Sequence, residues 1–106
     1  MKREDIQKSE RSLQASIVKE LTLLGFLVIH IPNQYSKGRV RDAGFVSGAP
    51  DLIVLKDGKV FFLEVKTKTG RVRPSQKLFA ERLRQHSFDY FVVRSIDDAL
   101  KAVGYG

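Results

Sequence analysis

The chain contains no cysteine among its 106 residues, so it can form neither a disulfide bond nor a zinc site with thiolate ligands. It also lacks any apolar run that approaches the ~20 residues of a membrane-spanning helix. Residues 1–11 carry too many charges for a signal peptide. We therefore expect a soluble, cytoplasmic protein with no membrane partner.

The composition suits one small domain with a basic surface. Hydrophobic residues make up 42% of the chain, enough for a single core, and the net charge is +7. A small basic domain suggests a polyanionic partner, most simply nucleic acid, although charge that serves solubility alone is the alternative. The candidate DNA-binding residues fall in two predicted loops: Lys37, Arg39 and Arg41 in one, and Lys68, Arg71 and Arg73 in the other.

Residues 48–66 are predicted to form a β-hairpin around which the domain is organised. Two apolar runs flank Asp57-Gly58, a pair that favours the positive φ angles of a tight hairpin turn. With these two residues as the loop, Lys56 pairs with Lys59 and the register of the two strands is fixed.

That register places two acids opposite each other. Counting back from the turn, Asp51 faces Glu64 with their Cβ atoms ~4.5–5.5 Å apart, and Lys66 points to the same face. Like charges so arranged destabilise a sheet and raise one carboxylate pKa unless a cation lies between them. Such oxygen ligands suit Mg²⁺ or Mn²⁺. The alternative is a surface hairpin with ordinary charges.

Helical periodicity is expected on both sides of the hairpin. The first helix begins at Ser9 as N-cap and ends at Gly25. Its apolar stripe consists of Leu13, Ile17, Val18, Leu21 and Leu24. The second helix opens at Pro74. Its predicted buried residues are Leu78, Phe79, Ala80 and Leu83. A strand at residues 88–94 and a short helix from Ser95 complete the chain.

One more strand is expected at residues 26–31, and His30 within it is interpreted as a packed or hydrogen-bonded residue rather than a ligand. Residues 33–47 form a long loop, of the kind that is usually functional or mobile. Residues 1–8 are predicted to be a polar tail and residues 9–106 a single domain. The resulting order is α-β-β-β-α-β-α. A helix between the third and fourth strands implies a right-handed crossover and a small mixed sheet flanked by helices.

A series of motifs resembles a known nuclease family. Gly48-Ala49-Pro50-Asp51, followed by a hairpin and Glu64-Val65-Lys66, resembles the PD-(D/E)xK nuclease signature. The full set resembles the VRR-NUC domain in its small stand-alone phage or bacterial form, and adds Ser9-Glu10, Pro32-Asn33 and Ser75-Gln76. The resemblance runs from about Ser9 to Val103. It implies a restriction-endonuclease-like α/β core and a metal-dependent DNA endonuclease of a bacterial cell or phage-infected host.

The resemblance also implies roles for individual residues. Asp51 and Glu64 would bind Mg²⁺ or Mn²⁺ together with the carbonyl of Val65. Lys66 would position or activate the attacking water and steady the phosphate. Gln76 matches a glutamine near the family's site.

A glutamate of the first helix usually adds a further ligand in this family, directly or through water. Glu10 is the best match because of its Ser-Glu context. In related junction resolvases the acid lies closer to the end of the helix, which corresponds to Gln14 here. Glu20 is the third candidate.

Stand-alone members of the family resemble Holliday-junction resolvases and act as homodimers. The resemblance therefore implies a structure-selective hydrolase of branched DNA, such as four-way junctions or flaps. No element for recognising bases stands out, so recognition by DNA shape is expected. Two alternatives are a non-catalytic nucleic-acid-binding module with a nuclease-like fold and a generic α/β domain with a protein partner.

Overall fold

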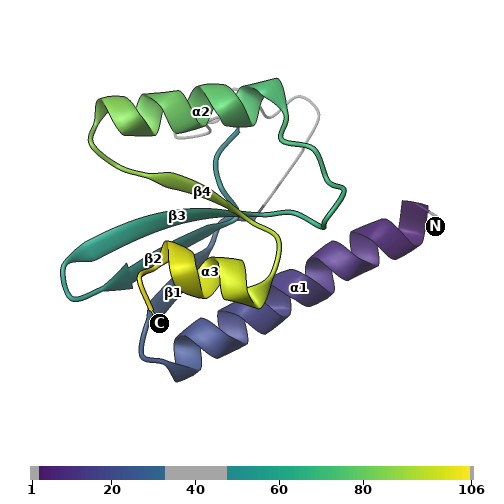
Figure 1. The fold of residues 1–106 in the computed structure, drawn as a ribbon, viewed down its shortest axis with the longest axis horizontal. Coiled ribbons are helices and arrows are strands. Elements are labelled where there is room, and N and C mark those ends of the chain that lie inside the picture. Colours follow the sequence, from purple (N-terminus) through teal and green to yellow (C-terminus); the bar gives the residue numbers. More distant parts are fainter. Residues whose placement is uncertain (1–2, 33–47, 106) are drawn as a thin grey trace.

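The computed structural model describes the backbone of residues 3–32 and 48–105, and the side chains of residues 10–32 and 48–105. The elements in chain order are α1 (Arg3–Leu23), β1 (Leu27–His30), β2 (Leu52–Lys56), β3 (Lys59–Val65), α2 (Pro74–Gln85), β4 (Tyr90–Val93) and α3 (Ile96–Ala102) (Figure 1). The predicted α-β-β-β-α-β-α order is confirmed. The predicted basic residues Lys37, Arg39 and Arg41 lie outside the described residues, as does the rest of the loop at 33–47.

The sheet is mixed, and its strands follow the order β1-β2-β3-β4. The first three strands are antiparallel neighbours, whereas β4 runs parallel to β3 because α2 carries the chain back across the sheet. In the hairpin, Lys56 pairs with Lys59, as predicted, and the ladder continues to Leu52 opposite Leu63. The φ angles of Asp57 and Gly58 are 51° and 79°, as their turn type requires.

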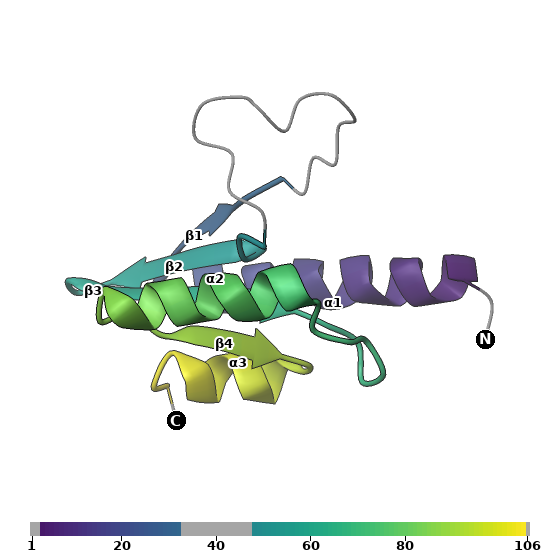
Figure 2. The same cartoon turned by 90° about the horizontal axis from the view of Figure 1, so that it is seen from above.

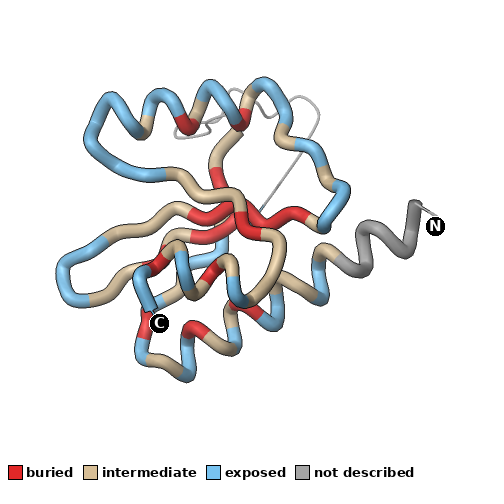
Figure 3. The backbone as a smooth tube through the Cα atoms, viewed as in Figure 1, coloured by how far each residue is buried: buried red, intermediate tan, exposed pale blue. Residues whose placement is uncertain are grey.

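Helices cover the two faces of the sheet unequally. Helices α1 and α3 pack on one face, and α2 lies on the other (Figures 1 and 2). The core lies between the sheet, α1 and α3, where buried residues gather in Figure 3. It includes Ile17, Leu21, Leu52, Val54, Leu63, Val65 and Val93. The opposite face is less covered, and Leu27 and Ile29 of the edge strand β1 remain 61% and 41% exposed there.

Helix α1 begins at Arg3, six residues before the predicted N-cap Ser9. The prediction of a helix start at Ser9 was therefore wrong. Residues 3–8 consist mostly of arginine, glutamate, glutamine and lysine, which are good helix formers, so the helix can begin before Ser9. No helix in the described part of the chain is both long and apolar enough to cross a membrane.

The inward face of α2 differs from the predicted stripe. Leu78 is 64% exposed, whereas Gln76 and Ala80 are buried and Leu83 is half-buried. Gln76 takes the inward position because its amide bonds to a buried carboxylate of the sheet. Leu78 lies roughly 200° further around the helix and therefore faces away from the sheet. The prediction that Leu78 is buried was wrong.

Candidate active site

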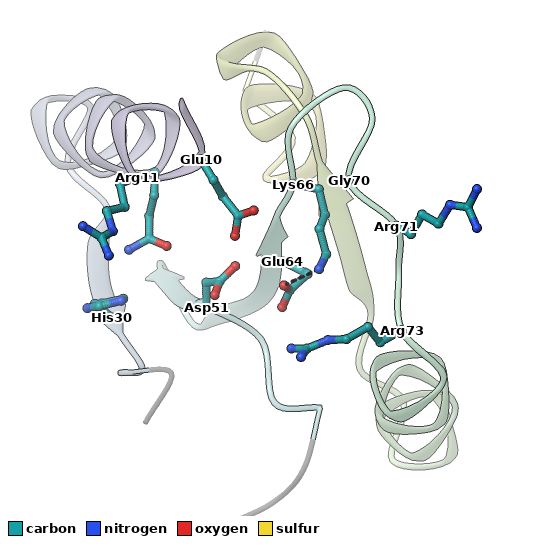
Figure 4. Close-up of a pocket in the computed structure, with 10 residues that line it drawn as sticks. Glu10, Arg11, His30, Asp51, Glu64, Lys66, Gly70, Arg71 and Arg73 are labelled. Carbon is teal, nitrogen blue, oxygen red and sulfur yellow. Dashed lines mark ion pairs between the residues drawn. The ribbon is translucent and has the colours of Figure 1, made fainter. Parts of the chain in front are cut away.

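Three charged side chains meet at one end of the sheet. Asp51 directly precedes β2, Glu64 lies in β3, and Lys66 follows β3. Their exposed fractions are only 7%, 2% and 8%. Figure 4 shows both carboxylates and the lysine pointing into one cleft. The hairpin register therefore brings together the charges that the sequence predicts to be neighbours.

Asp51 is held by the two strands on either side of it. Its backbone carbonyl accepts a hydrogen bond from the Ile31 amide at 2.8 Å. Its carboxylate oxygen Oδ2 accepts one from the Val65 amide, also at 2.8 Å. The Asp51 side chain thus bonds to the backbone next to Glu64, and this contact fixes the carboxylate.

Glu64 is surrounded by polar groups from α2, from β4 and from the segment after β3. Gln76 of α2 donates from Nε2 to Glu64 Oε2 at 2.9 Å, and the Tyr90 hydroxyl of β4 donates to Oε1 at 3.3 Å. The Lys66 Nζ lies 3.6 Å from Oε2. Gln76 is itself oriented, because its Oε1 accepts a hydrogen bond from the Arg73 amide at 2.8 Å. Both carboxylate oxygens of Glu64 therefore have defined directions.

Burial makes this pair of acids unfavourable when both are charged. Burial, and next the nearby Asp51 carboxylate, raise the pKa of Glu64 to about 8, although Lys66 opposes the shift. Burial also raises the pKa of Glu10, again against Lys66. The pKa of Tyr90 is raised by burial and by Glu64, so its hydroxyl keeps its proton and remains a donor. The site therefore favours an added positive charge.

The acids line a cleft of about 790 Å³ between α1 and the segment after β3 (Figure 4). Its lining residues are Glu10, Arg11, Gln14, His30, Asp51, Glu64, Lys66, Gly70, Arg71 and Arg73. Asp51 and Glu64 lie at the end of the sheet, the α1 side of the cleft carries Glu10 and Arg11, and the opposite side carries Arg71 and Arg73. Such an arrangement suits a phosphodiester that crosses the acids while its neighbouring phosphates contact the sides.

The candidate residues of α1 are distinguished by their place. Glu10 and Gln14 both line the cleft, whereas Glu20 does not. The preference for Glu10 as the acid of this helix is thus compatible with its position.

The basic residues after β3 differ among themselves. Arg73 extends toward the acids and Arg71 points away from them (Figure 4). Lys68 is exposed and does not line the cleft.

Three residues near the acids were not predicted to act there. His30 is exposed and lines the cleft, so its interpretation as a packed residue was wrong. It is the last residue of β1, which is an edge strand of the sheet. Arg11 directly follows the candidate Glu10 in the sequence, and this neighbourhood could have predicted that Arg11 also lies near the site. Tyr90 offered none, because its approach to Glu64 depends on the parallel pairing of β4 with β3.

The donor atoms fit a hard divalent cation. Two buried carboxylates at the ends of neighbouring strands supply oxygen ligands, and burial, followed by the charge of Asp51, raises the pKa of Glu64. Within the described residues, however, no three acidic or histidine side chains gather closely enough to hold an ion. Glu10 therefore lines the cleft without completing a compact set with Asp51 and Glu64.

Gly48 allows the segment before Asp51 to pass close to α2. Its φ angle is +83°, and a Cβ atom there would overlap the backbone carbonyl of Ser75 and lie 2.9 Å from the Gln76 amide nitrogen. We expect Gly48→Ala to lower the free energy of unfolding by more than the ~1–3 kcal/mol that strained backbone alone costs. Because Gln76 would move, the contact with Glu64 should weaken as well. Chemical denaturation measures the loss.

Gly58→Ala is the matched control. Gly58 has a similar φ of +79° but nothing lies within 4 Å of its added Cβ, so this variant isolates the cost of the backbone angle. Equal destabilisation by the two substitutions would show that the close approach of Gly48 to α2 is unimportant.

Comparison with known proteins decides the family. The sequence pattern of the VRR-NUC domain matches residues 7–97. The chain belongs to the VRR-NUC domain family. A solved VRR_NUC domain is 32% identical with a TM-score of 0.67, and the match covers 90% of this chain and 94% of that one. The candidate site of this chain therefore lies on a domain with a nuclease-type fold.

A second solved structure supports the fold alone. This VRR_NUC domain protein is 21% identical with a TM-score of 0.74, and the match covers 90% of this chain and 84% of that one. No curated protein matches the chain. The mixed sheet flanked by helices is therefore that of VRR-NUC structures.

Proposed function

We propose that this VRR-NUC protein is a metal-dependent endonuclease that hydrolyses phosphodiester bonds of DNA, with the chemistry of the PD-(D/E)xK nucleases. The observation that carries the proposal is the buried group of Asp51, Glu64 and Lys66 on the floor of a cleft with basic sides. Neither a solvated surface hairpin nor a protein-docking surface accounts for two buried acids with a raised carboxyl pKa.

Asp51, Glu64 and the carbonyl of Val65 would hold Mg²⁺ or Mn²⁺. When bound, the cation supplies a water that is nucleophilic at neutral pH and offsets charge on the phosphate. Gln76 and Tyr90 keep the Glu64 carboxylate oriented. The ammonium of Lys66, 3.6 Å from the Glu64 carboxylate, is placed to orient the attacking water and to contact a phosphate oxygen.

Glu10 is proposed to act through a water rather than as a direct ligand, since no compact three-acid group forms in the described part of the chain. We expect Glu10→Gln to lower the cleavage rate about 10- to 100-fold, the usual cost of removing an outer partner of a metal site. Glu20→Gln is the matched control, because it makes the same change on the same helix outside the cleft. A loss with Glu20→Gln and none with Glu10→Gln would reverse the assignment.

Branched DNA is the proposed substrate and a homodimer the proposed form. The net charge of +7 supports binding to a polyanion, and the cleft offers phosphate contacts without an evident element for recognising bases. A second copy would bring a second site to a second strand. The exposed Leu27 and Ile29 of the edge strand β1 are candidate contacts between copies.

The alternative is a non-catalytic nucleic-acid-binding module with the same fold. One observation favours it, namely that no three aspartate, glutamate or histidine side chains cluster among those that the structure describes. Such a module would bind DNA through the basic sides of the cleft and would leave the strands intact in any metal.

A cleavage assay separates the two functions. Wild type and Glu64→Gln are incubated with a four-way junction, a flap and a linear duplex, each in Mg²⁺, Mn²⁺ or EDTA. Cutting by wild type alone, only with metal and faster on branched DNA, supports the proposal. Tight binding without cutting in either metal favours the binding module. Equal cutting of all three DNAs would remove the preference for branches.

A further inference from the structure

Arg94 holds the segment that follows Lys66. It lies directly after β4, and its Nη1 donates to the backbone carbonyls of Thr67 at 2.6 Å, Gly70 at 2.7 Å and Lys68 at 3.3 Å. The backbone of Arg94 is fixed in turn, because its amide donates to Asp98 Oδ2 at 2.9 Å. One side chain therefore ties a whole turn of the chain to the end of the sheet.

The turn that Arg94 holds forms one side of the candidate active site. Gly70, Arg71 and Arg73 line the cleft, whereas Arg94 is not among the lining residues. A Cβ atom at Gly70 would lie 3.4 Å from Cδ of Lys66, so the backbone of the turn lies against the stem of that lysine. The position of the turn therefore affects where Lys66 and the arginines of the turn lie in the cleft.

The far end of the same segment is coupled to the acids. The Arg73 amide donates to Gln76, and Gln76 donates to Glu64. The Arg73 side chain extends from this point toward the acids, while Arg71 points away (Figure 4). Residues 67–73 are thus held by Arg94 at one end and by the first turn of α2 at the other, which leaves Arg73 a narrow range of positions.

We propose that Arg94 is a positioning residue that sets DNA affinity by holding residues 67–73 so that Arg73 faces the bound phosphate. This proposal rests on the proposed DNA substrate but not on cleavage. A free loop would have to be ordered when DNA binds, and that ordering would lower affinity. Arg94 removes this cost in advance without touching the DNA.

The test is a double-mutant cycle on DNA binding. Affinity for a four-way junction is measured in EDTA, where metal-dependent cutting does not occur, for wild type, Arg94→Ala, Arg73→Ala and the double variant. We expect Arg94→Ala to weaken binding roughly tenfold in the wild-type background and less than about twofold in the Arg73→Ala background. The salt dependence should fall by about one phosphate contact in each single variant.

Arg84→Ala controls for charge. Arg84 is exposed on α2, where it pairs with Glu81 at 3.1 Å, so its loss removes the same charge outside the cleft. It should leave both affinity and salt dependence near wild type. If thermal unfolding shows that Arg94→Ala does not fold, the cycle is run with Arg94→Lys, whose ammonium reaches less far than the guanidinium and holds the three carbonyls less well.

Two results would overturn the proposal: an Arg94 variant that binds as wild type does, or a loss that is equally large when Arg73 is absent. Failure of the proposed function is a separate outcome. It would be seen as wild-type protein that binds the junction in this assay and never cuts it in metal.

Discussion

Glu64→Gln is expected to lower the rate of metal-dependent DNA cleavage by at least about 10³-fold, equivalent to ~4 kcal/mol of transition-state stabilisation. The substitution keeps the size of the side chain and its contact with Gln76 but removes the charge that a divalent cation needs. DNA binding should be kept, since the substitution leaves the basic groups that line the cleft in place. Single-turnover cleavage and equilibrium binding, measured in parallel, check the two halves of this prediction.

Glu81→Gln is a suitable control for Glu64→Gln. Glu81 lies on the exposed side of α2, and its one hydrogen bond and ion pair among the described side chains is with Arg84, so cleavage should not change. Asp51→Asn and Lys66→Ala should also lower the rate of metal-dependent cleavage. Cleavage by Glu64→Gln at the wild-type rate would show that the reaction does not use this cleft.

The stability of the metal-free protein is expected to fall as the pH rises from about 5 to 8. The pKa of Glu64 is about 8 in the folded chain, against 4.5 for an ordinary glutamate, so the folded state retains a proton that the unfolded state releases. The stabilisation by this proton is complete below the pKa that Glu64 has in the unfolded chain. It is lost as the pH rises through the pKa that Glu64 has in the folded chain. At ~1.4 kcal/mol per pKa unit, this shift corresponds to at most roughly 5 kcal/mol.

The groups around Glu64 explain why the proton is retained. Burial and Asp51 disfavour its charged form, whereas Lys66 and the Tyr90 hydroxyl favour it but do not compensate. Urea denaturation between pH 5 and 9 in EDTA measures the effect. Mg²⁺ should flatten the curve, because metal binding takes the place of the proton and stabilises the folded state.

Glu64→Gln supplies the comparison for the pH experiment as well. Without a carboxyl group at this position the decline between pH 5 and 8 should largely disappear, and at pH 8 in EDTA the variant should be more stable than wild type. The same decline in wild type and variant would place the titrating group elsewhere.

The sequence by itself determined the hairpin and, through it, the meeting of Asp51 with Glu64. This was possible because the signals are local. Asp57-Gly58 specifies a two-residue turn, and the turn fixes which residues of the two strands face each other. The order of the elements and the start of α2 at Pro74 also followed from local patterns.

Only the tertiary structure decided how the surrounding groups are used. The rotation of α2 follows from the bond between Gln76 and Glu64, which overrides the apolar stripe that predicted a buried Leu78. The contact of Tyr90 with Glu64 required the parallel pairing of β4. Arg94 reaches carbonyls more than twenty residues earlier in the chain. Such contacts join segments far apart in sequence, and no local pattern encodes them.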